Sequence, residues 1–176
     1  MSLTQFAMIT LISLISFFYV VRLPGLKMNL RDVPGIKIFL ISAVWSVACV
    51  ALPAGDTFST LECLMFLSVF LLIFSLAICF DIRDIGVDEP KKRTIPQMVG
   101  VSGSKWISTA SYLASVLCIV LINTCWWPAQ LISAAFFIPL IWYSGRKRNE
   151  FYFVLLLDGI LIVQPLVYFG FNALNQ

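Results

Sequence analysis

Six long apolar stretches, separated by short polar connections, are the feature that most constrains what this chain can fold into. A helix needs about 20 residues to cross the hydrocarbon core of a bilayer, and each stretch is close to that length. Hydrophobic residues make up 60% of the 176 residues, charged residues only 12%, and the mean hydropathy is +0.95. Soluble domains do not have this composition. We therefore expect an all-α integral membrane protein whose six transmembrane helices form one bundle, at residues 3–21, 36–52, 60–80, 106–122, 126–143 and 151–171.

The positions of the basic residues support the same number of spans. All 12 Lys and Arg residues lie in or beside the first, third and fifth connections. Neither terminus holds one, and neither does the second or the fourth connection. Short loops rich in Lys and Arg stay on the cytoplasmic side of a membrane. This segregation predicts a multi-pass protein of the cell inner (plasma) membrane with both termini outside and the third connection in the cytoplasm.

The whole chain, residues 1–176, has room for one transmembrane domain and no separate soluble domain. It contains no histidine, and its five cysteines lie in or beside the spans without C-x-x-C spacing. This pattern excludes a Cys/His zinc site, a histidine haem ligand and a histidine general base. We expect the cysteines to pack between helices. The expected surroundings are the lipid bilayer, and no nucleic acid is expected as a partner.

An acidic cluster directly after the third apolar stretch carries the chemistry. Asp81, Asp84 and Asp88 form the pattern D-x-x-D-x-x-x-D. Nothing before Gly86 opposes a helix, so we expect the third span to continue into the cluster and to stop before Pro90. Offsets of three, four and seven residues would then bring the three carboxylates onto one helix face. That face is a candidate site for a divalent cation.

Basic residues follow the acidic cluster within the same connection, at Lys91, Lys92 and Arg93. Mg²⁺ commonly binds one or two carboxylates together with substrate phosphates, and neighbouring cations can bind the remaining phosphate charge. The connection therefore predicts Mg²⁺-dependent binding of a diphosphate. The alternative is an acidic helix face that is simply solvated.

Other candidate residues leave two interpretations open. Lys27, in the basic first connection, either holds that loop in the cytoplasm near anionic lipids or shares in anion binding. Tyr19, at the inner end of the first span, either anchors the interface or projects into a cavity. Asp158, inside the sixth span, is either functional or makes a structural hydrogen bond to a neighbouring helix.

Two further expectations concern segments near the predicted cytoplasmic face. Residues 94–104 are rich in turn-forming residues, which predicts a cap that could close over the site, with the fourth span beginning at Ser102 or Ser104. Aromatic residues at Trp106 and Trp142 are expected near the cytoplasmic interface, whereas Trp45 falls mid-span and is expected to pack.

The stretch FDIRDIGVDEPKKRTIP at residues 80–96 resembles the second aspartate-rich motif of the UbiA superfamily of intramembrane prenyltransferases. In that family, D-x-x-D-x-x-x-D is followed by a basic residue, Thr and Pro. The connector with Lys27, Arg31 and Pro34-Gly35, after Tyr19, also resembles the family's loop between its fourth and fifth helices. The resemblance extends across essentially the whole chain.

The resemblance implies a fold and an activity. Family members are nine-helix enzymes that bind a prenyl diphosphate through Mg²⁺ held between two aspartate-rich motifs. They transfer the prenyl group to an aromatic or other lipid-quinone-precursor acceptor. By match, the catalytic, Mg²⁺-binding residues would be Asp81, Asp84 and Asp88, and the substrate-binding residues would be Lys92, Arg93, Tyr19 and Lys27.

The sequence also departs from the family. The family's first motif, N-D-x-x-D-x-x-x-D, has no counterpart, and the six spans correspond to helices four to nine. We therefore expect little or no transferase activity from this chain alone. Three explanations are open: a fragment of a longer enzyme, a split enzyme whose partner chain supplies the first motif, or a non-catalytic membrane subunit or scaffold that binds lipid head groups or a partner protein.

Overall fold

The computed structural model describes residues 2–21, 35–85, 94–122, 127–145 and 148–174, and within these ranges it contains helices and no strand. The expected all-α fold is therefore confirmed for the described residues. In chain order the elements are α1 (Leu3–Val20), α2 (Ile36–Ser46), η2 (Val47–Ala51), α3 (Leu52–Ala54), α4 (Thr60–Asp84), α5 (Ile95–Ile122), α6 (Trp127–Tyr143), η5 (Tyr152–Leu157) and α7 (Ile160–Leu174).

Three helical segments of the described chain are long and apolar enough to cross a membrane: Ile36–Ala54, Thr60–Asp84 and Ile95–Ile122. Shorter apolar helices cover Leu3–Tyr19, Trp127–Tyr143 and Tyr152–Leu166. Each of the six apolar stretches is thus largely helical, as a helical membrane protein requires, because backbone groups in lipid must bond within their own segment. The number of spans stays a prediction.

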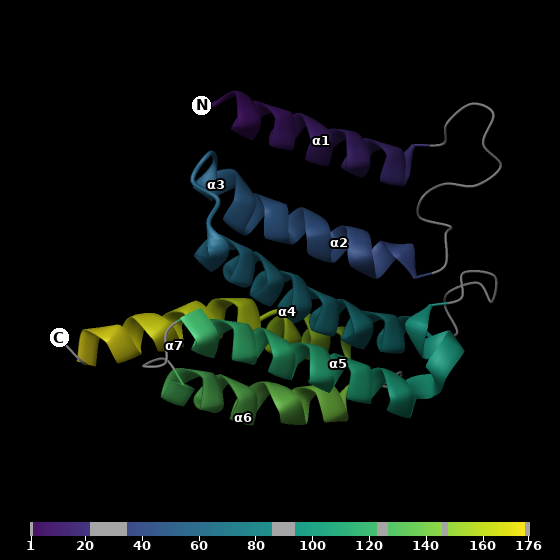
Figure 1. The fold of residues 1–176 in the computed structure, drawn as a ribbon. Coiled ribbons are helices and arrows are strands. Elements are labelled where there is room, and N and C mark those ends of the chain that lie inside the picture. The colour runs from purple at the N-terminus through teal and green to yellow at the C-terminus, as the bar shows by residue number, and fades with distance from the viewer. Residues whose placement is uncertain (1, 22–34, 86–93, 123–126, 146–147, 175–176) are drawn as a thin grey trace.

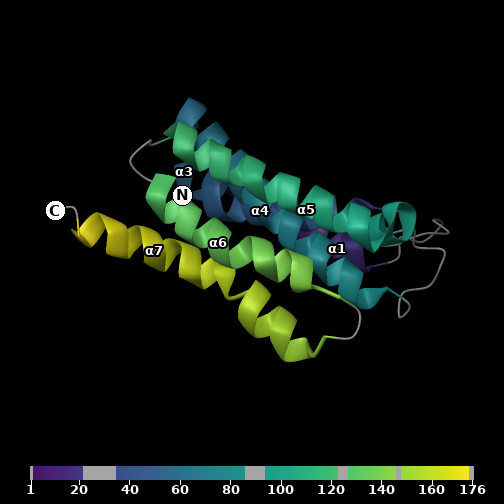
Figure 2. The same ribbon diagram turned by 90° about the horizontal axis from the view of Figure 1, so that it is seen from below.

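The helices lie side by side, and the longer ones, α1, α2, α4, α5, α6 and α7, alternate in direction along the chain (Figures 1 and 2). The central helix α4 packs against α2 and α5, while α6 packs against α5 and α7. The ends of α1, α4 and α6 and the starts of α2 and α5 lie at one end of the bundle, and both chain termini lie at the other (Figure 1). We call the first the basic end, because it holds the described cations Lys37, Arg83, Lys105 and Arg148.

Paired serines hold α4 against α5. The Ser68 and Ser115 hydroxyls lie 3.0 Å apart, and one antiparallel heptad along, those of Ser75 and Ser108 lie 2.8 Å apart. Ser115 and Ser108 also bond the backbone carbonyls of Ser68 and Ser75. Small side chains let the two backbones approach closely, and the pairing satisfies every one of these hydroxyls without water. The result is a close α4–α5 contact that positions the end of α4.

The acidic cluster is only partly helical in the described chain. The helix α4 begins in a capping box formed by Ser59 and Glu62 and ends at Asp84, with Ile85 as its C-cap. Asp81 and Asp84 therefore lie in the last turn of α4, as expected. Asp88 lies outside the described residues, so the predicted extension of the helix to that position stays untested.

The segment at 94–104 is the clearest correction to the sequence analysis. Helix α5 begins at Ile95, earlier than expected, and a non-helical Gly100, with φ +76°, divides it into two parts. The long second part starts directly after Gly100, close to the predicted start at Ser102. The Thr94 amide donates to the Gln97 side chain at 3.2 Å, which is half of a capping box. Pro96 lies in the first turn, where its missing N–H costs nothing. A kinked helix therefore replaces the expected turn-rich cap.

The sixth apolar stretch is broken at Asp158 and Gly159, between η5 and α7. The Asp158 amide donates to the Phe153 carbonyl, five residues back, at 3.0 Å. A Cβ atom at position 159 would lie 2.2 Å from the Leu155 carbonyl oxygen, so only glycine fits there without a backbone shift. This break fixes the position of Asp158 beside the end of α4.

Candidate functional site

A cavity of about 380 Å³ lies between α2, α4 and the junction of η5 with α7. Its charged lining residues are Lys37, Arg83, Asp84 and Asp158, and the rest of its lining is apolar. Ligand pockets in proteins commonly have volumes of about 300–1,000 Å³ and combine an apolar wall with a few charged groups. The cavity is therefore large enough for a small amphipathic molecule with a charged head.

An ion pair joins α2 to α4 at one side of this cavity. The Lys37 ammonium donates to Asp81 Oδ1 at 3.0 Å. The Asp81 side chain is only 3% exposed, whereas that of Lys37 is 34% exposed and lines the cavity. Below the pair, α2 and α4 pack through Ile38 and Ile78, both fully buried. Lys37 can therefore present a positive charge to a ligand from a fixed position.

A second ion pair belongs to α4 alone. Arg83 Nε donates to Asp84 Oδ1 at 2.7 Å, and its Nη2 atom lies 3.4 Å from Oδ2. The guanidinium also lies 5.1 Å from the centre of the Phe80 ring and 5.4 Å from that of Phe153, which adds cation–π attraction. Arg83 interacts electrostatically with Asp158 across the cavity. These contacts hold both charges of the pair at the charged end of the cavity.

A smaller cavity of about 230 Å³ lies between α1 and α2 and is lined by Tyr19. Ile41 and Trp45 line both cavities, so the two are neighbours across α2. Tyr19 also lies near enough to Lys37 to interact with it electrostatically. The structure thus favours the cavity interpretation of Tyr19.

Of the predicted site residues, Asp84 and Asp158 line the larger of these two cavities. Asp81 is paired with Lys37, which lines the same cavity, and Tyr19 lines the smaller, neighbouring one. The other four, Asp88, Lys27, Lys92 and Arg93, lie outside the described residues and stay predictions.

The sequence analysis missed Lys37 and Arg83 as site residues, and it expected Trp45 to pack. Trp45 instead remains 48% exposed and lines both cavities. The sequence did contain a signal for Lys37, because this cation lies inside the first turn of a predicted span. A charge that only sets the topology would more commonly lie in the loop before the span.

The described carboxylates match Mg²⁺ in chemical type. Asp81 and Asp84, one helical turn apart, supply hard oxygen donors, and Mg²⁺ needs only one or two carboxylates when a substrate phosphate supplies the others. Each is ion-paired to a cation in this structure. Within the described ranges, no three Asp, Glu, Cys or His residues gather as a candidate metal site. Further oxygen ligands would have to come from the substrate's phosphate groups or from Asp88.

No family model, curated protein or solved structure matches this chain. The resemblance to the UbiA superfamily therefore stays a prediction carried by the motif at residues 80–96 and by the pattern of spans.

Proposed function

We propose that this chain is a UbiA-like intramembrane prenyltransferase, or the C-terminal portion of one, and that its main cavity binds a prenyl diphosphate. The observation that carries the proposal is the combination of two fixed cations and two carboxylates at one end of an apolar cavity. Lys37 and Arg83 would bind the diphosphate, and the apolar wall would bind the prenyl chain. The proposal places the motif at 80–96 in the cytoplasm of the inner membrane, with six spans and both termini outside.

Ligand binding would exchange the partners within the two ion pairs. The oxygens of a diphosphate would accept hydrogen bonds from Lys37 and Arg83, because charge-assisted bonds to phosphate are among the strongest available to these side chains. Asp81 and Asp84 would then hold Mg²⁺ in place of Lys37 and Arg83. When bound, Mg²⁺ would neutralise charge that develops on the leaving diphosphate.

The apolar part of the cavity would serve the prenyl group. Phe80 and Trp45 line it, and aromatic faces stabilise a neighbouring cation. Excluding water would protect an allylic cation until an aromatic or lipid-quinone-precursor acceptor reacts with it. By resemblance, Lys92, Arg93 and Lys27 would add donors to the diphosphate. The family's first motif has no counterpart here, so we expect binding without appreciable turnover unless a partner chain supplies it.

The test is calorimetric titration of geranyl diphosphate into the full chain in phosphatidylcholine nanodiscs, with and without Mg²⁺. We expect saturable binding that requires Mg²⁺ and that D84N weakens about tenfold or more. The matched control is D56N, because Asp56 is an exposed carboxylate at the opposite end of the bundle. Equal binding by wild type, D84N and D56N would overturn the site assignment.

A second candidate function is that of a non-catalytic membrane subunit. The observation in its favour is that Asp81 and Asp84 are both already paired with cations of this chain, as in a purely structural charge network. This role predicts a stable partner protein and no Mg²⁺-dependent binding of geranyl diphosphate. The same titration therefore separates the two functions.

A further inference from the structure

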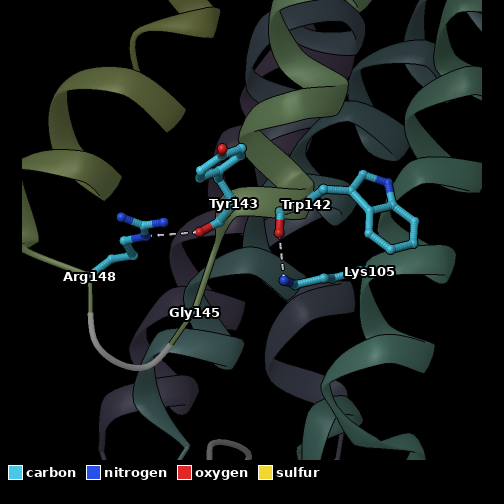
Figure 3. A pocket seen from close by; sticks show the side chains of 5 residues that line it. All are labelled: Lys105, Trp142, Tyr143, Gly145 and Arg148. Atoms are coloured by element: carbon cyan, nitrogen blue, oxygen red, sulfur yellow. Dashed lines mark hydrogen bonds between the residues drawn. The ribbon is translucent and has the colours of Figure 1, made fainter.

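A third pocket, of about 460 Å³, lies at the basic end where α5 passes the end of α6. It is lined by Lys105, Trp142, Tyr143, Gly145 and Arg148. Figure 3 shows Lys105 reaching the end of α6 from one side and Arg148 reaching it from the other. None of the proposed diphosphate ligands lines this pocket, so it is a separate feature of the molecule.

The two cations of the pocket each bond one carbonyl at the end of α6. Lys105 Nζ donates to the Trp142 carbonyl at 2.6 Å, and Arg148 Nε donates to the Tyr143 carbonyl at 3.2 Å. Such bonds satisfy carbonyls that a helix end leaves without partners. An ammonium has three N–H groups and a guanidinium five, so capping uses only one donor of each. The remaining donors are available to a ligand.

The charge of this pocket is not balanced within the described part of the chain. The ion pairs of the described residues involve Lys37 and Arg83. Neither Lys105 nor Arg148 forms an ion pair with a described residue. The pocket's lining also contains no carboxylate. Two cations that share an open pocket without an acidic partner favour an anion as the ligand.

Aromatic side chains place the pocket at the level of lipid head groups. Trp106, 63% exposed, meets Trp142 edge to face at 5.0 Å between ring centres. The Arg148 guanidinium lies 5.2 Å from the centre of the Tyr143 ring. Exposed Trp and Tyr side chains concentrate at the membrane–water interface. We therefore expect Lys105 and Arg148 at the level where phospholipid phosphates are the most abundant anions.

We propose that the pocket of Lys105, Trp142, Tyr143 and Arg148 binds the phosphate of an anionic phospholipid from the surrounding bilayer. Lys105 and Arg148 donate to the phosphate oxygens, and the exposed Trp and Tyr rings contact the upper part of the acyl chains. Capping of α6 alone would explain one bond from each cation, but it would explain neither the open pocket nor the absence of a carboxylate partner in the described chain.

The test is lipid retention by the full chain, released from detergent micelles that contain equal amounts of phosphatidylglycerol and phosphatidylcholine and analysed by native mass spectrometry. We expect wild type to retain phosphatidylglycerol preferentially. K105Q and R148Q should each lower the ratio of phosphatidylglycerol to phosphatidylcholine about fivefold. One basic residue near an anionic surface typically strengthens binding by about this factor. A ratio within one sample cancels any general loss of folded protein.

The matched controls are K105R and R148K, which keep the charge and should keep most of the preference. An unchanged ratio in both K105Q and R148Q would overturn the proposal. In phosphatidylcholine micelles without phosphatidylglycerol, excess inorganic phosphate should leave no stable adduct. A phosphate adduct that K105Q abolishes would assign the pocket to free phosphate and would overturn the lipid assignment.

Discussion

Within the described residues, the basic end of the bundle holds two pairs of cations that differ in their partners. Lys37 and Arg83 face a largely apolar cavity, and each is ion-paired with an aspartate of α4. Lys105 and Arg148 face a pocket with exposed aromatic rings, and each bonds a carbonyl of α6 instead. The difference teaches that partners, rather than the cations, determine the ligand. In our proposals, the paired charges suit a metal-bound diphosphate, whereas cations without an acidic partner among the described residues suit a single anionic head group.

The largest effect is expected from K37Q. This change removes a diphosphate donor and the cation beside Asp81, so geranyl diphosphate should bind about a hundredfold more weakly. Stability should fall by about 2 kcal/mol, less than for a fully buried pair, because Lys37 is partly exposed. Calorimetric titration and thermal unfolding in the same nanodiscs measure the two effects.

The double variant K37Q/D81N separates binding from stability. With both charges neutral, its melting temperature should lie nearer to that of wild type than the value for K37Q. Diphosphate binding should stay lost. A double variant that regains binding together with stability would show that Lys37 acts only by holding the fold.

The next largest effect on affinity is expected from R83Q. Asp84 and two aromatic rings hold the Arg83 guanidinium in place. Its loss should therefore weaken the binding of geranyl diphosphate about tenfold. Titration of R83K gives the contrast, since lysine keeps the charge but not the planar contacts with the rings. Equal affinities for wild type, R83K and R83Q would remove Arg83 from the site.

A smaller effect is expected from G159A, which changes the residue next to Asp158 of the cavity. The matched control is G145A, in the pocket of Lys105 and Arg148. A Cβ atom at 159 collides with the Leu155 carbonyl, whereas one at 145 meets nothing within 4 Å. G159A should therefore cost about 1–3 kcal/mol and also weaken diphosphate binding by displacing Asp158. G145A should stay within about 0.5 kcal/mol of wild type in thermal unfolding.

The double variant K105Q/R148Q is expected to have the smallest effect on the binding of geranyl diphosphate in the cavity. If the two regions are independent, geranyl diphosphate should bind the double variant within about twofold of wild type. The measurement is titration in phosphatidylcholine nanodiscs, where no anionic lipid is present. A loss of affinity similar to that of K37Q would join the two regions into one site.

The sequence was a good guide to the helices and a poorer one to the site. Each apolar stretch predicted a helix well. In lipid there is no water to bond the backbone N–H and C=O groups, so they must bond to each other within the segment. The helical turns at 95–99 were missed because residues 94–104 were interpreted as a turn-rich segment, although Thr94 and Gln97 carry a capping signal. That error concerned local chemistry, which the sequence contained.

The site depends on contacts between distant residues, which spacing along the chain does not specify. The acidic motif located Asp81 and Asp84, but one partner of Asp81 is Lys37, 44 residues away on another helix. The break in the sixth apolar stretch lies at Asp158, which faces the same cavity as Arg83, and this arrangement does not follow from a local pattern. Helix packing, rather than helix formation, therefore limited the prediction.

The most direct test of the central claim compares three ligands of the full chain: geranyl diphosphate, pyrophosphate and geraniol, each with Mg²⁺. A cavity with a charged end and an apolar wall should bind geranyl diphosphate at least about tenfold more tightly than either half, because the two halves contribute jointly. Both halves should compete with it. Geraniol binding as tightly as geranyl diphosphate, with no competition from pyrophosphate, would contradict the assignment of Lys37 and Arg83 as diphosphate ligands.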